Sequence, residues 1–88
     1  MNYLKVITDK ELSQSEKILM IYFLHHYKSS GISTSYKRIS EELNITKPTL
    51  IKAIKGLEDK GIIRKENNTN ILGGVGVNTY KVITNKYL

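Results

Sequence analysis

Apolar and polar positions change their spacing along the chain, and each change marks a new element. The first long apolar surface covers Ile18–Leu24 and continues to Tyr27. It follows Ser13 and Glu16, which have the spacing of a capping box, in which the serine hydroxyl accepts from the amide three residues later and the glutamate reaches back to the serine amide. We therefore expect a first helix over roughly residues 14–29.

A short amphipathic segment comes next. Ser35 is a plausible N-cap, and the apolar positions Tyr36, Ile39 and Leu43 then recur at helical spacing. Asn44 follows, and asparagine tolerates the left-handed backbone conformation better than other non-glycine residues. We expect a second helix of about two turns that ends near Leu43, with Asn44 closing it and reversing the chain.

A third helix is predicted immediately after this turn. Thr46 can cap it, Pro48 fits its first turn because the missing amide hydrogen costs nothing there, and Gly61 can end it after Lys60. Its apolar positions have the i, i+3, i+4, i+7 spacing of a single buried stripe. They are Leu50, Ala53, Ile54 and Leu57.

Beyond Gly61 the pattern changes to that of a β-hairpin. Residues 62–67 and 77–83 read as strands, and 67–76 as a loop rich in glycine and asparagine. Tyr3–Ile7 is apolar enough for a short strand or an extended arm. The predicted fold is α+β, mainly α: a single domain over residues 1–88, with a strand or arm in 1–12, three helices in 13–61 and a hairpin in 62–83.

The amino-acid composition makes the chain basic. The 88 residues include 40% hydrophobic and 25% charged side chains, and fourteen Lys plus Arg against eight Asp plus Glu give a net charge of +6. The longest apolar run is seven residues, far below the roughly 18–20 that cross a bilayer. The absence of cysteine excludes disulfides and fits a reducing cytoplasm. The basic excess favours a polyanionic partner.

Catalytic and cofactor chemistry have no support in the sequence. No nucleophile and base are paired, and His25 and His26 lie about 100° apart around a helix, so they cannot share one metal-binding face. The run 73–76 is rich in glycine but lacks the Lys-Ser/Thr that completes a phosphate-binding loop. We expect no enzyme activity, no cofactor, no metal and no membrane contact.

Two helices joined by a three- to four-residue turn form a helix-turn-helix, whose second helix can enter a DNA major groove. Residues 35–60 fit that description. The stretch from Ser35 to Leu50, with Ala53–Ile54, Leu57–Glu58 and Lys60–Ile63, resembles the core of bacterial winged helix-turn-helix proteins. In that family a hairpin called the wing follows. More narrowly, residues 12–19, with the Tyr3–Ile7 segment before them, resemble N-terminal domains of plasmid replication initiators and phage replisome organisers.

This resemblance implies that one face of the third helix lies in the major groove, and that the wing lies against phosphate or the minor groove. Lys47 and Thr49 are at the helix start, where the positive dipole end favours phosphate, whereas Thr49, Ile51 and Lys52 suit base edges. The expected DNA contacts are Lys47, Pro48, Thr49, Ile51, Lys52, Lys55, Ser35, Lys37, Arg64, Lys65, Asn68 and Asn70.

The leading hypothesis is a non-catalytic domain that binds double-stranded DNA in replication initiation or replisome organisation, in a bacterium or mobile element. A transcriptional repressor with the same fold is the alternative. A second alternative is a protein-interaction or oligomerisation module, because the broad apolar surface of the first helix could also pair two copies in a homodimer.

Overall fold

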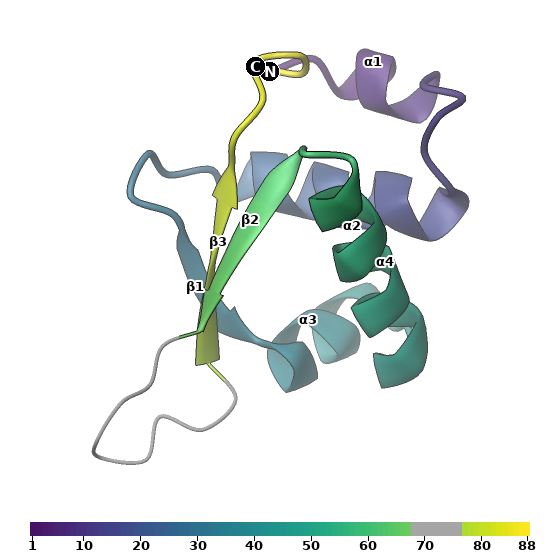
Figure 1. Ribbon diagram of the computed structural model, residues 1–88. Coiled ribbons are helices and arrows are strands. Elements are labelled where there is room, and N and C mark those ends of the chain that lie inside the picture. Colours follow the sequence, from purple (N-terminus) through teal and green to yellow (C-terminus); the bar gives the residue numbers. More distant parts are fainter. Residues whose placement is uncertain (68–76) are drawn as a thin grey trace.

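The computed structural model describes residues 1–67 and 77–88 of the chain. Over these residues the protein is mainly helical, with an added antiparallel sheet (Figure 1). In chain order the elements are α1 (Tyr3–Ile7), α2 (Gln14–His25), β1 (Ile32–Ser35), α3 (Tyr36–Leu43), α4 (Lys47–Asp59), β2 (Ile63–Asn67) and β3 (Val77–Val82).

The helices and the sheet enclose one hydrophobic core. Helix α4 packs against α2, α3 and β2, and α2 also contacts β3. The centre of the core is aromatic, because the ring of Phe23 on α2 stacks on Tyr80 of β3 with centroids 5.1 Å apart. Leu19, Ile39 and Leu57 complete it from three different helices, and all three are fully buried. The predicted α+β fold, with a winged helix-turn-helix arrangement, is confirmed.

The sheet contains one strand more than the predicted hairpin. Its strand order is β1-β3-β2, with both pairings antiparallel, so β3 is the central strand. The residues of β1 pair with β3 from Ile32 opposite Tyr80 to Ser35 opposite Val77. Sequence patterning misses β1 because four residues carry too little periodicity, and its pairing partner lies more than forty residues away along the chain.

The hairpin strands are close to their predicted bounds. Strand β2 begins at Ile63 and β3 ends at Val82, one residue inside the prediction at each position. The flanking residues nevertheless continue the pairing, because the Ile83 amide donates to the Ile62 carbonyl at 3.0 Å. Such one-residue differences are usual at element ends. The glycine-rich run 73–76 lies outside the described residues.

Helix α2 starts as predicted and ends early. The capping box is confirmed: the Glu16 amide donates to Ser13 Oγ at 3.2 Å, and the Ser13 amide donates to Glu16 Oε1 at 2.8 Å. The pattern predicts helix to about residue 29, but α2 ends at His25. The chain turns after this helix, which brings β1 beside β3. Gly31 lies in this turn with φ of +98°, and an added Cβ there would lie 2.6 Å from Thr79 Cγ2.

The segment Tyr3–Ile7 forms a helix, which corrects the expected strand or extended arm. Asn2 caps it by accepting from the Lys5 amide at 3.0 Å, and Val6 is its buried residue. The helix sits beside the C-terminal segment, since the Asn2 amide donates to the Tyr87 carbonyl at 2.7 Å (Figure 1). This packing decides the conformation, because five residues are too few to show a helical period.

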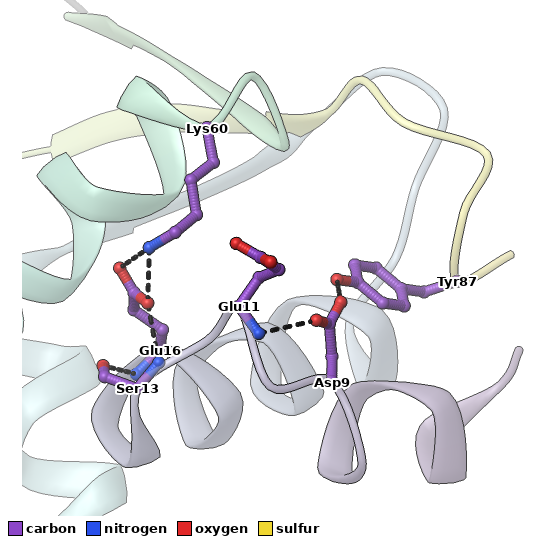
Figure 2. Close-up of polar contacts among 6 residues, drawn as sticks. All are labelled: Asp9, Glu11, Ser13, Glu16, Lys60 and Tyr87. Carbon is purple, nitrogen blue, oxygen red and sulfur yellow. Dashed lines mark hydrogen bonds and ion pairs between the residues drawn. The ribbon is translucent and has the colours of Figure 1, made fainter.

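Two acidic side chains fasten these outer segments to the core (Figure 2). Asp9 accepts from the Tyr87 hydroxyl and pairs with Lys86 at 2.8 Å. Glu16 accepts from Lys60 Nζ at 2.8 and 2.9 Å, and thereby joins the first turn of α2 to the end of α4. An added Cβ at position 56 would overlap the Glu16 carboxylate, so a larger residue there would displace that side chain from its present position.

These two contacts make the domain acid-sensitive. The hydrogen bonds from Lys86 and Tyr87 hold the pKa of Asp9 well below its usual range. Burial raises the pKa of Glu16, but hydrogen bonds from Lys60 and the Ser13 amide outweigh it, so the pKa is lowered. Both carboxyls therefore take up protons more readily in the unfolded chain than in the folded one. The stabilisation that these contacts give is fully present at pH values above the unfolded-state pKa, and it is lost as the pH falls through the folded-state pKa.

We expect the melting temperature, followed by circular dichroism, to fall as pH drops below about 4.5. Glu16→Gln should flatten part of this decline, because the amide does not titrate. The matched control is Glu41→Gln, which changes an exposed glutamate on α3 and should retain the wild-type acid profile. An unchanged pH dependence in Glu16→Gln would show that the Glu16–Lys60 pair does not contribute to the acid sensitivity.

Candidate nucleic-acid interface

The turn between α3 and α4 sets the angle of the two helices. Asn44 ends α3 in the left-handed conformation, with φ of 54° and ψ of 47°, as its residue type predicts. The Ile45 amide then donates to the Ser40 carbonyl at 3.1 Å. Thr46 caps α4 by accepting from the Thr49 amide at 3.4 Å, and Pro48 lies in the first turn. The chain thus reverses within a few residues.

Helix α4 buries one stripe and exposes the opposite face. The four stripe residues predicted from the sequence are its buried residues. All six α4 residues predicted to contact DNA are exposed: Lys47, Pro48, Thr49, Ile51, Lys52 and Lys55. The apolar side chain among them, Ile51, is 41% exposed. This cationic face of α4 is exposed in the described part of the chain and is accessible to a partner.

Tyr36 is the point where α3, α4 and the sheet meet. The ammonium of Lys65, on β2, donates to the Tyr36 hydroxyl at 2.9 Å and lies 5.6 Å from the ring centroid. Lys47 Nζ, from the start of α4, lies 6.0 Å from the same centroid. Cations at this range are attracted to the face of an aromatic ring. Two predicted DNA contacts that are distant in sequence are therefore neighbours.

The electrostatics of this junction keep it cationic. The hydrogen bond to the Tyr36 hydroxyl raises the pKa of the Lys65 ammonium, although partial burial opposes the shift. Sequence reasoning assigned Tyr36 to the apolar side of its helix and missed this contact. The available signal was its position directly after the Ser35 cap, which puts it in the first turn of α3.

Ser35 and Lys37 lie beside the junction. Ser35 has a structural role, because its hydroxyl accepts from the Arg38 amide at 3.1 Å and caps α3. Lys37 is exposed in the first turn of that helix. Arg38 is paired with Glu42 at 2.9 Å, so it is less available to another anion than Lys37.

The two basic residues of β2 lie on opposite sides of the sheet. Side chains alternate along a strand, and the register places Lys65 opposite buried Tyr80 but Arg64 opposite Lys81. Arg64 is exposed on the outer face, where Glu66 and Lys81 form an ion pair at 3.1 Å. The structure therefore separates Arg64 from the Tyr36 junction. Asn68 and Asn70 lie outside the described residues.

Comparison with known proteins decides the family. Residues 10–63 match the family model described as a helix-turn-helix domain. This match covers more than half of the chain. The chain belongs to the helix-turn-helix domain family. No curated protein matches it.

Membership of this family implies that the domain binds DNA. Domains of this family are typically non-catalytic.

Across residues 1–67 and 77–88 no group of three or more His, Cys, Asp or Glu side chains could hold a metal ion. In the same residues, no helix is long and apolar enough to span a membrane.

The Tyr36 junction can be tested by its effect on proton binding. Tyr36→Phe keeps the ring but removes the hydroxyl acceptor, so the pKa of Lys65 should fall, because its partial burial is no longer opposed by that hydrogen bond. The measurement is an NMR titration of the lysine side-chain signals. The matched control Tyr27→Phe changes a half-buried tyrosine just after the end of α2 and should leave Lys65 unaffected. An unshifted Lys65 in Tyr36→Phe would contradict the contact.

Proposed function

We propose that this helix-turn-helix domain binds double-stranded DNA by inserting the exposed face of α4 into the major groove, without catalysing a reaction. The observation that carries the proposal is the orientation of α4. Its apolar stripe is buried against the domain, while Lys52 and Lys55 project from the other side and form no ion pair among the described residues. A sequence pI of about 9.6 supports a polyanionic partner.

The proposed interface residues fall into two groups, those suited to phosphate and those suited to base edges. Lys47, beside Tyr36, and Lys65 on the wing strand suit phosphate, because both present a point charge near the positive end of α4. Ile51 and Lys52 lie farther along the exposed face and suit base edges, since an apolar group can meet a thymine methyl and lysine can donate to guanine. The chain has only two arginines, so bidentate guanine recognition is scarce and modest specificity, or recognition of DNA shape, follows.

We assign the domain to replication initiation or replisome organisation in the cytoplasm of a bacterium, or on a mobile element. The support is the resemblance of residues 12–19 to the N-terminal domains of such proteins. Transcriptional repression uses the same binding face and is the alternative. The position of the binding sites in the genome distinguishes the two functions.

A self-association function has its own supporting observation. An apolar hollow of about 530 Å³ lies between α1, α2 and the end of α3, lined in part by Tyr3, Ile18 and Leu43. Of these lining residues, Tyr3 is 39% exposed and Ile18 is 45% exposed. Contiguous apolar surface of this kind marks interaction sites in many proteins. A homodimer formed here would leave α4 accessible and would respond little to salt.

Duplex binding is tested by fluorescence anisotropy over a range of salt concentrations. If about four to six phosphates are neutralised, the logarithm of the affinity should fall with the logarithm of salt concentration at a slope of about −4 to −5. The double variant Lys52→Glu/Lys55→Glu should weaken binding by at least about 100-fold, because it places two negative charges against the DNA.

The matched control for this double variant is Lys5→Glu/Lys28→Glu, which makes the same change in net charge at two exposed lysines remote from α4. Its effect should be much smaller, because charges more than about 10 Å away are screened by salt. Equal losses in both double variants, or no duplex binding by the wild type at low salt, would contradict the proposal.

The assignment to replication is tested by selecting fragments of the source genome with the purified domain. Enrichment of fragments from a replication origin is expected. Enrichment of promoter fragments alone would contradict the replication assignment and favour the repressor, and both outcomes would leave duplex binding intact.

A further inference from the structure

A groove runs along one side of α4 and extends beyond the helix-turn-helix itself. It has a volume of about 730 Å³ and lies between α4 and the segment that leads into α2. Thr49, Lys52 and Lys55 line it from α4, and Lys10 lines it from the opposite wall. Lys10 is exposed and precedes the first turn of α2 by a few residues. The groove is therefore continuous with the face of α4 that is expected to meet DNA.

We propose that this groove holds one sugar-phosphate strand of the duplex, and that Lys10 is a phosphate contact. The inference rests on the proposed function, because it needs α4 in the major groove. It adds a residue outside the helix-turn-helix and outside the predicted interface, and it assigns to the start of α2 a direct part in binding.

The shape of the major groove calls for contacts on both flanks of the inserted helix. A major groove is about 12 Å wide and is bounded by a phosphate strand on each side. With 100° per residue, Lys47 and Thr49 lie about 200° apart around α4. The flank of Lys47 carries the Tyr36 junction and the Lys65 ammonium. The flank of Thr49 carries the groove with Lys10, so each flank offers cations to one strand.

The groove carries more positive than negative charge once the ion pair between Glu16 and Lys60 is set aside. Glu16 lines the groove, but the residue is only 6% exposed, and its carboxylate is paired with Lys60 and accepts from the Ser13 amide. Figure 2 shows this pair, with Glu11 lying between it and Asp9. Glu11 and Asp59 are exposed acids on the lining. Within residues 1–67 and 77–88, Lys10, Lys52 and Lys55 form no ion pair. Three lysines of the groove therefore face two acids, which favours a phosphate strand and limits its affinity.

The groove also fits a strand better than a compact ligand. It is framed by lysine side chains on both walls. Lysine is a flexible point charge that follows a backbone without reading its sequence.

The test compares Lys10→Gln with Lys5→Gln by fluorescence anisotropy on the same duplex. Both variants remove one charge from an exposed lysine near the N-terminus, but only Lys10 lines the groove. Lys10→Gln should weaken binding several-fold and reduce the magnitude of the salt slope by about one, as expected for one lost phosphate contact. Lys5→Gln should keep the wild-type slope. Asp59→Asn should tighten binding, because it removes an acid from the groove wall.

The outcomes separate this inference from the proposed function. If the wild type binds duplex with the expected salt slope and Lys10→Gln behaves as Lys5→Gln does, the groove does not hold a phosphate strand, and α4 alone carries binding. If the wild type fails to bind duplex at low salt, the proposed function itself is wrong. Cooperative melting of each variant, measured by circular dichroism, shows that any loss of affinity is not a loss of fold.

Discussion

The packing of α4 against α2 is the contact on which the rest of the structure depends. Leu50, Ala53, Ile54 and Leu57 bury one side of α4, and burial of such side chains contributes about 1.5–3 kcal/mol for each large one. At the end of the helix, Lys60 reaches Glu16, and Gly56 leaves room for that carboxylate. The same packing that stabilises the domain thus decides which side of α4 remains exposed.

The ion pair and the glycine act together as a geometric constraint. A surface ion pair is worth little by itself, and Lys60 is only partly buried. Its importance lies in the position of Glu16, which also caps α2 through the Ser13 amide. One carboxylate therefore links the start of α2 to the end of α4, so the orientation of α4 relative to α2 depends on the cap of α2.

The Tyr36 junction performs a comparable role on the side that is proposed to face DNA. It brings the first turn of α3, the start of α4 and strand β2 together through one ring and two lysines. The exposed lysines of α4 and of this junction form cationic surfaces. Their charges cost the domain little because water solvates them, and a bound polyanion would neutralise them. Stability comes from the buried face of the helices, and the proposed DNA binding uses the opposite face.

The sequence by itself determined the elements whose signals are local. The capping box at Ser13 and Glu16, the left-handed Asn44, the Thr46 cap with Pro48 and the apolar stripe of α4 each depend on neighbours a few residues away, so α2, α3 and α4 start where the pattern predicts. Together they place the face of α4 that the six predicted residues occupy. The family match over residues 10–63 agrees with this part of the prediction.

Only the tertiary structure decided the rest, because the deciding partners are distant along the chain. Strand β1 exists through its pairing with β3, and that pairing makes α2 end at His25. Tyr3–Ile7 is a helix because Val6 is buried and the C-terminal segment lies against it. The contact of Lys65 with Tyr36, and the groove that joins Lys10 to α4, bring together side chains 29 and more than 35 residues apart. No periodicity in a sequence encodes such contacts, since they depend on how complete elements pack.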